Sequence, residues 1–119
     1  MKKENIIQDK SYNFALRIVK LYKHLSQEKR EFILSEQLLR SGTSIGANIE
    51  EAIGGQSEKD FYAKLTISYK EARETKYWIR LLKDSEYLDK EIANDFLNNV
   101  EELLRIVGSI QKTLKNKNS

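Results

Sequence analysis

Few side chains in this sequence could carry out chemistry, and His24 is the only histidine among them. Carboxylate-bridged metal sites in four-helix proteins use a Glu-x-x-His pair from each of two helices, whereas Leu21, Tyr22 and Lys23 precede His24. Its helical position places it on a charged face, which favours a surface histidine over a metal ligand. Cysteine is absent, so no thiolate ligand or cysteine nucleophile can form. The sequence therefore predicts neither a metal nor another cofactor.

Two serines and an asparagine in one predicted helix are the remaining candidates. Ser41 and Ser44 have no second histidine to act as a base, and no Gly-x-Ser-x-Gly elbow or phosphate-binding glycine loop is present. An unpaired buried polar group costs about 1–3 kcal/mol, so Ser41, Ser44 and Asn48 need partners. Glu71 and Glu74 could supply the acceptors. We interpret these residues as a structural polar network, and we predict that the protein is not an enzyme.

Four segments have the apolar spacing of amphipathic helices, and they cover residues near 6–25, 31–54, 58–84 and 90–115. The last has the clearest seam, formed by Ile92, Phe96, Val100, Leu103, Val107, Ile110 and Leu114. Proline is absent and only five glycines occur, which favours helices over sheets. Short connections make consecutive helices antiparallel. The predicted fold class is all-α, an antiparallel up-down-up-down four-helix bundle, in a single domain of residues 1–119.

Gly42 and Gly46 stand one turn apart inside the second predicted helix, where each costs about 1 kcal/mol relative to alanine. The absence of side chains at both positions leaves a groove on one face of that helix. We therefore expect the backbone of a neighbouring helix to pack closely against these glycines.

Serines mark two of the connections. Ser57, with Asp60 three residues on, predicts a capped start for the third helix. Ser26 and Ser35 could each cap a helix start, which would leave a short helical piece in the first connection.

Basic residues follow one stripe on the first predicted helix and another on the third. The net charge is only +3, so the distribution of charge is more informative than its sum. Stripes of this kind could follow phosphate groups, and tyrosines alternate with the second stripe. The predicted nucleic-acid-binding residues are Lys3, Lys10, Arg17, Lys20, Arg73, Lys76, Arg80 and Lys83.

A second apolar strip, outside the core stripe, occupies the first predicted helix and continues on the third. One helix surface cannot bury two such strips within its own bundle, and exposed strips usually mark a protein interface. We therefore predict a homo-oligomer. The predicted interface consists of Tyr12, Leu16, Val19, Tyr62, Tyr69, Tyr77 and Leu81.

The first ten residues contain three lysines but no apolar run of signal length. No window approaches the ~20 apolar residues of a membrane span. We expect a cytoplasmic protein without membrane contact.

The run from Gln37 to Ala52, QLLRSGTSIGANIEEA, resembles the bacterial four-helix-bundle family encoded in intervening sequences of large-subunit ribosomal RNA genes. Ala52 is a departure, because many members have glycine there, although Gly54 and Gly55 follow shortly. The similarity extends over nearly the whole chain. It continues at Ser57, Asp60, Phe61, Leu65, Ile67, Tyr69, Glu71, Ala72, Arg73, Glu74, Tyr77 and Trp78.

The resemblance implies a four-helix bundle. Relatives that accompany diversity-generating retroelements are pentameric barrels that bind nucleic acid and a reverse transcriptase, so it also implies a pentamer and RNA or DNA as a partner. Members are often labelled ribosomal proteins because of where their genes lie. With two residues of the shared run added, the predicted polar network is Arg40, Ser41, Ser44, Asn48, Glu51, Glu71 and Glu74.

Three functional hypotheses follow. The first is a non-catalytic, oligomeric protein that associates with nucleic acid, in particular RNA, and whose affinity falls steeply with salt. The alternative is a protein-interaction scaffold that binds no nucleic acid and uses its exposed tyrosines and the Leu16 strip. The third is an enzyme or metal protein that uses the region of Asn48 and Glu71.

Overall fold

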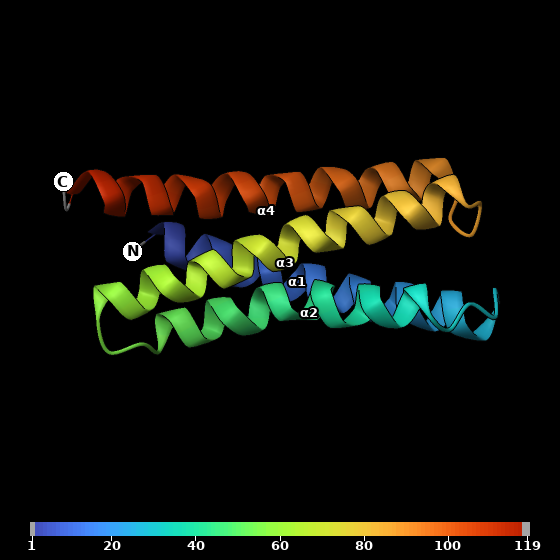
Figure 1. Ribbon diagram of the computed structural model, residues 1–119, viewed down its shortest axis with the longest axis horizontal. Helices are drawn as coiled ribbons and strands as arrows, with labels where there is room; N and C mark the ends of the chain where they lie inside the picture. The colour runs from blue at the N-terminus through green and yellow to red at the C-terminus, as the bar shows by residue number, and fades with distance from the viewer. Residues whose placement is uncertain (1, 118–119) are drawn as a thin grey trace.

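The computed structural model describes the backbone of residues 2–117 and the side chains of residues 6–117. Within this part of the chain there are four α-helices and no β-strand: α1 (Lys2–Gln27), α2 (Leu34–Ile53), α3 (Glu58–Asp84) and α4 (Lys90–Lys117). The helices alternate in direction, so α1 begins and α4 ends at the same end of the molecule (Figure 1). The bundle measures 48 × 21 × 20 Å. The predicted all-α, up-down-up-down bundle is confirmed.

Helix boundaries agree with the predicted ones to within a few residues, and α3 begins and ends where the sequence places it. Ser57 caps α3, because its hydroxyl accepts a hydrogen bond of 3.0 Å from the backbone N–H of Asp60. The predicted cap is therefore confirmed.

The connection between α1 and α2 differs from the prediction. Ser26 and Ser35 donate their hydroxyls to carbonyl oxygens one turn earlier, at 2.8 and 2.6 Å, so neither caps a helix start. The cap is the carboxylate of Glu31, which accepts hydrogen bonds of 2.7–3.2 Å from the backbone N–H groups of residues 33–35. A negative charge at this position also stabilises the helix dipole. As a result α2 starts at Leu34, and no helical piece precedes it.

The buried side chains form one core along the bundle axis. The predicted seam of α4 is confirmed from Phe96 to Leu114. Its first member is wrong, because Ile92 is 43% exposed while Ala93 is fully buried. Leu88, in the turn before α4, is also buried and already fills this end of the core. The first turn of α4 therefore needs only a small inward-facing residue, and Ile92 faces solvent.

Close approach of α1 and α2 at Gly42 and Gly46 agrees with the prediction. A Cβ atom at Gly42 would lie 2.9 Å from both Cγ atoms of Ile18. A Cβ atom at Gly46 would lie 3.3 Å from the backbone carbonyl oxygen of Ser11. The glycines therefore allow interhelical contacts that no larger residue could make, which offsets their low helix propensity.

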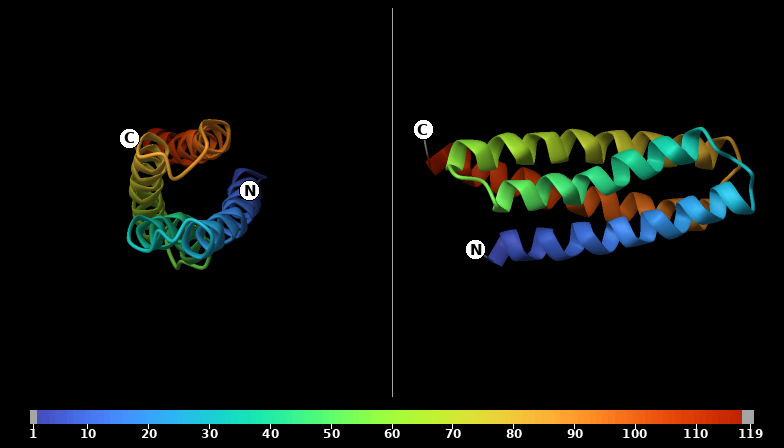
Figure 2. Two further views of the ribbon diagram at one scale, coloured as in Figure 1. Left: turned by 90° about the vertical axis from the view of Figure 1, so that its right-hand side faces the viewer. Right: turned by 90° about the horizontal axis from the view of Figure 1, so that it is seen from below.

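Among neighbouring helices, α1 and α4 pack least closely, as the end-on view in Figure 2 shows. Phe14 and Phe96 meet edge to face, with ring centroids 6.1 Å apart. The guanidinium of Arg17 lies 4.3 Å from the centre of the Phe96 ring and forms an ion pair of 2.5 Å with Asp95. It also donates a hydrogen bond to Asn99. Charged and aromatic contacts therefore contribute much of the packing between these two helices.

Candidate nucleic-acid interface

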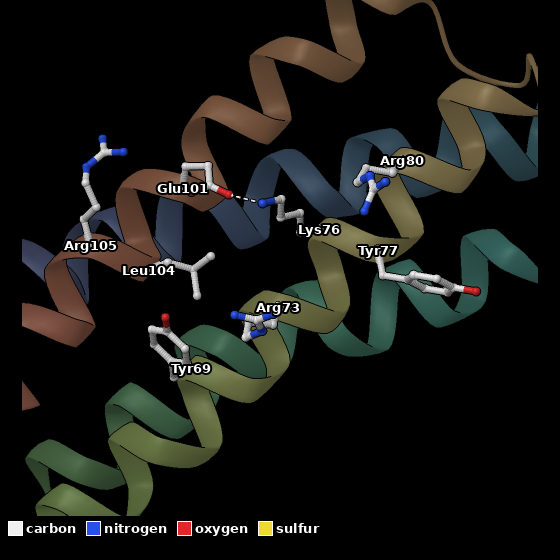
Figure 3. Close-up of a pocket in the computed structure, with 8 residues that line it drawn as sticks. All are labelled: Tyr69, Arg73, Lys76, Tyr77, Arg80, Glu101, Leu104 and Arg105. Atoms are coloured by element: carbon white, nitrogen blue, oxygen red, sulfur yellow. Dashed lines mark ion pairs between the residues drawn. The ribbon is translucent and has the colours of Figure 1, made fainter.

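A groove of about 390 Å³ lies between α3 and α4, and we call it the α3–α4 groove (Figure 3). Its walls are Tyr69, Arg73, Lys76, Tyr77 and Arg80 from α3, and Glu101, Leu104 and Arg105 from α4. The α3 members recur at helical spacing, which keeps them on the side of the helix that borders α4. The structure thus brings three of the predicted nucleic-acid-binding residues together with two of the predicted interface tyrosines.

Four cations and one carboxylate line this groove, which leaves a net charge of +3. Lys76 Nζ lies 2.6 Å from Glu101 Oε1, a buried atom with no other polar partner among the described residues. Arg73, Arg80 and Arg105 are exposed and form no ion pair within residues 6–117. Because Lys76 and Glu101 neutralise each other, the three arginines carry the excess positive charge.

Arg105 is a residue of the groove that sequence reasoning missed. It stands one turn after Glu101, and the sequence of α4 alone does not reveal that this side of the helix borders the basic stripe of α3. A weak signal was available, because no acidic residue follows Arg105 in the chain. That pattern indicates a basic helix end but not the surface to which it contributes.

Two tyrosines lie at different depths in the groove. Tyr69 packs near Gly108 of α4, where a Cβ atom would lie 3.8 Å from the tyrosine ring. Tyr77 is 52% exposed and meets Trp78 edge to face, with ring centroids 5.0 Å apart. Trp78 in turn donates its indole N–H to a Glu74 carboxylate oxygen at 3.1 Å. The Tyr69 ring therefore forms part of the groove wall, and the Tyr77 ring lies at the rim of the groove.

The basic stripe of α1 lies apart from this groove, because α1 and α3 do not pack against each other. Lys10 and Arg17 form ion pairs with carboxylates of α4, at 3.3 and 2.5 Å. Lys20 is exposed, and Lys83 is half-buried and does not line the groove. The side chain of Lys3 lies outside the described residues. Of the eight predicted positions, the three of central α3 converge on the α3–α4 groove, while Lys10 and Arg17 line a separate hollow between α1 and α4.

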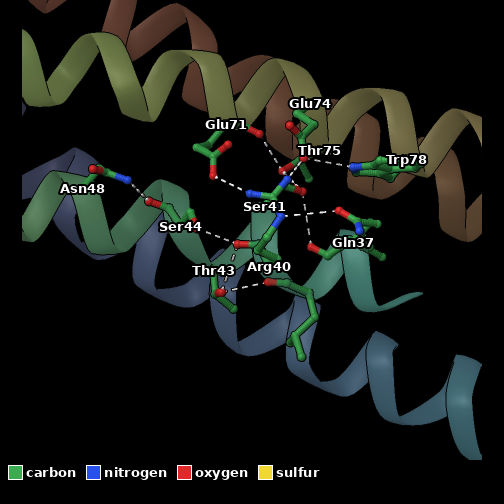
Figure 4. Close-up of polar contacts among 12 residues, drawn as sticks. Gln37, Arg40, Ser41, Thr43, Ser44, Asn48, Glu71, Glu74, Thr75 and Trp78 are labelled. Atoms are coloured by element: carbon green, nitrogen blue, oxygen red, sulfur yellow. Dashed lines mark hydrogen bonds and ion pairs between the residues drawn. The ribbon is translucent and has the colours of Figure 1, made fainter. Parts of the chain in front are cut away.

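Arg40 links α2 to α3 on the opposite side of α3 (Figure 4). Its guanidinium donates a hydrogen bond of 3.1 Å to Glu71 and forms an ion pair with Glu74. Ser41 is buried, and its hydroxyl lies 2.9 Å from that of Thr75. Four of the predicted network residues therefore do join the two helices.

The remaining network residues, Ser44, Asn48 and Glu51, form no hydrogen bond to Glu71 or Glu74 among the described residues. Ser44 donates to the backbone carbonyl of Arg40 at 2.6 Å, and Asn48 donates to that of Ser44 at 2.8 Å. Glu51 forms a separate ion pair of 2.8 Å with Lys64. The prediction that the α3 carboxylates accept hydrogen bonds from these α2 side chains is wrong. Those carboxylates bind the charged guanidinium, while half-buried serine and asparagine bond carbonyls of their own helix.

Thr75 and Ser68 are polar contacts that the sequence reasoning did not assign. Ser68 is buried and donates a hydrogen bond of 3.0 Å to the carbonyl oxygen of Ile45 in α2. Both residues stand on the core-facing side of α3, in line with its buried apolar residues. A small polar residue at such a position is the signal in the sequence that indicates a buried polar contact.

The second apolar strip lies outside the core. Tyr12 and Leu16 are 61% and 48% exposed, and Val19 is half-buried. On α3, Tyr62 and Leu81 are half-buried. Tyr12, Leu16 and Tyr77 are therefore exposed, whereas Tyr62 and Tyr69 are partly buried against the core. The interface and the oligomer stay predictions.

No group of three or more His, Asp or Glu side chains among the described residues could hold a metal ion. His24 Nδ1 lies 2.5 Å from a carboxylate oxygen of Glu28, one turn later on the surface of α1. Among residues 2–117, no helix is both long enough and apolar enough to cross a membrane.

These features define a helical-bundle protein with an open basic groove between α3 and α4. The chain belongs to the family described as 23S rRNA-intervening sequence protein, which matches residues 3–109. It is similar to a crystal structure described as a protein with unknown function from the S23 ribosomal protein family of Bacteroides thetaiotaomicron. The two chains are 51% identical with a TM-score of 0.91, over 92% of this chain and 98% of that one. No curated protein matches the chain.

Proposed function

We propose that this protein is a non-catalytic nucleic-acid-binding protein and that the α3–α4 groove is its binding surface. The observation that carries the proposal is a set of three arginines that form no ion pair within residues 6–117, Arg73 and Arg80 on one wall and Arg105 on the other. Guanidinium groups bind phosphate oxygens through paired N–H donors. Because none of the three has an ion pair to break first among the described residues, each can bind phosphate.

Two further observations support this proposal over the enzyme hypothesis. Asn48 donates to a carbonyl of its own helix, and Glu71 accepts a hydrogen bond from Arg40, so both side chains already have structural partners in the bundle. The family description and that of the structural relative refer to ribosomal RNA or the ribosome, which makes RNA the first nucleic acid to test. Such a partner places the protein in the cytoplasm.

An electrophoretic shift series with RNA and DNA at two salt concentrations tests the proposal. Three phosphate contacts on a single strand predict an affinity that falls ~20-fold between about 50 and 200 mM salt. Absence of any shift at the lower salt concentration would contradict nucleic-acid binding and favour the protein-interaction scaffold.

We also propose that the protein is a homo-oligomer that uses the exposed strip of Tyr12, Leu16 and Val19 on α1. Leu16→Glu places a charge in the middle of this strip, so it should dissociate the assembly without unfolding the bundle. Light scattering measures the mass, and circular dichroism checks the helices. Ile67→Glu on α3 is the matched control, because Ile67 is 43% exposed and lies outside the strip. A wild-type monomer at micromolar concentration would rule out the assembly.

A further inference from the structure

The charges of the α3–α4 groove are divided between its two walls. Arg73 and Arg80 belong to α3 and Arg105 belongs to α4, while the Lys76–Glu101 ion pair bridges the helices between them (Figure 3). A strand that lies along the groove could therefore contact cations on both sides. The phosphates of this strand would lie over the floor of the groove, where the charges of Lys76 and Glu101 neutralise each other.

The width of this groove distinguishes between nucleic-acid forms. The axes of two packed helices are roughly 8–10 Å apart, whereas the major groove of a B-form duplex is by itself about 12 Å wide. A duplex would therefore rest on the rim of the groove and could not lie between its walls. A single strand is narrow enough to lie between both walls.

The Tyr77 ring indicates what else the strand must offer. Its ring is 52% exposed at the rim, in the same groove as Arg73 and Arg80. The edge-to-face contact with Trp78, which is itself hydrogen-bonded to Glu74, favours one orientation of the ring. A fixed aromatic face beside phosphate-binding groups suits a stacked base, because little side-chain entropy remains to be lost on binding. Bases within a duplex are already stacked on one another and cannot use such a surface.

From this arrangement we infer that the α3–α4 groove binds single-stranded nucleic acid, with an unpaired base stacked on Tyr77 and the phosphates held by arginines of both walls. The inference rests on the proposed function and names its substrate class. Stacking is tolerant of base identity, so the groove should show little sequence preference.

Fluorescence anisotropy with a labelled oligonucleotide, free or annealed to its complement, tests the inference on the full-length protein. We expect the single strand to bind at least about tenfold more tightly than the duplex. Tyr77→Leu should weaken single-strand binding about tenfold and leave duplex binding unchanged, whereas Tyr77→Phe should retain the wild-type affinity. Tyr87→Leu is the matched control, because Tyr87 is an exposed tyrosine outside the groove and its loss should change neither affinity.

The experiment distinguishes a failure of the single-strand inference from a failure of the proposed function. Equal affinity for single strand and duplex, or an equal loss for both in Tyr77→Leu, would overturn the single-strand inference and leave the proposed function standing. Binding to neither form at low salt would overturn the proposed function, and the inference with it. Circular dichroism of each variant ensures that a loss of affinity is not a loss of fold.

Discussion

Gly42→Leu should destabilise the bundle by about 3 kcal/mol or more, at the upper end of the cost of overpacking a core. The first side-chain atom alone would lie 2.9 Å from both Cγ atoms of Ile18. These atoms are attached to a β-branched carbon, so one change of rotamer cannot remove both contacts. The α1 backbone would have to move away, and the contact of Ser11 with Gly46 would be lost with it. Urea unfolding followed by circular dichroism measures the change.

Two single substitutions to alanine, at Gly108 and at Gly42, provide the control for this prediction. Gly108 also lies within a helix, but its nearest side-chain neighbour would be 3.8 Å from a new Cβ atom, which is an ordinary contact distance. Gly108→Ala should therefore stabilise the protein by about 1 kcal/mol, the gain in helix propensity. Gly42→Ala should destabilise it despite the same gain. Stabilisation by both alanines would show that α1 does not pack tightly on α2.

The double variant Arg73→Glu and Arg80→Glu should weaken nucleic-acid binding on the order of 100-fold, from the loss of two charge-assisted contacts of about 1.5 kcal/mol each. Neither arginine forms an ion pair within the described part of the chain, so the fold should tolerate both changes. The slope of log affinity against log salt should also become shallower, because fewer counterions are released. Anisotropy titrations at several salt concentrations measure both quantities.

A control double variant on α1, Lys20→Glu with Lys23→Glu, changes the net charge by the same amount as the double arginine variant. Both lysines are exposed and form no ion pair among the described residues. If the α3–α4 groove is the binding surface, this control should lose only the small, long-range part of the attraction. An equally large loss in both double variants would mean that net charge, and not the groove, determines affinity.

Much of the fold could be predicted because helical periodicity is a local property. The Phe96 to Leu114 seam, the Ser57 cap and the close approach at Gly42 each depend on residues within one or two turns of one another. The misassigned parts lie at helix ends. Ile92 was placed in the core because it continues the apolar spacing, and only the position of Leu88 in the preceding turn shows that this space is already filled.

The start of α2 was misjudged for a related reason. A glutamate three residues before a helix is an uncommon cap, whereas Ser26 and Ser35 are common ones. The choice between them depends on how the chain turns after α1. It turns at Arg30, whose φ of 57° lies in the region that favours glycine, and the turn brings the Glu31 carboxylate to the backbone N–H groups of the next helix. The residue types alone do not predict this conformation.

The spacing of apolar residues along each helix is enough to predict the four helices, their order and the face that each one buries. The pairing of the charged faces depends on how the helices pack against one another. Lys10 and Arg17 were predicted to bind phosphate with Arg73 and Arg80, yet they form ion pairs with α4, while Arg105 of α4 lines the same groove as Arg73 and Arg80. The physical reason is that contacts between helices depend on their relative rotation and offset, which the packing of all four helices sets together.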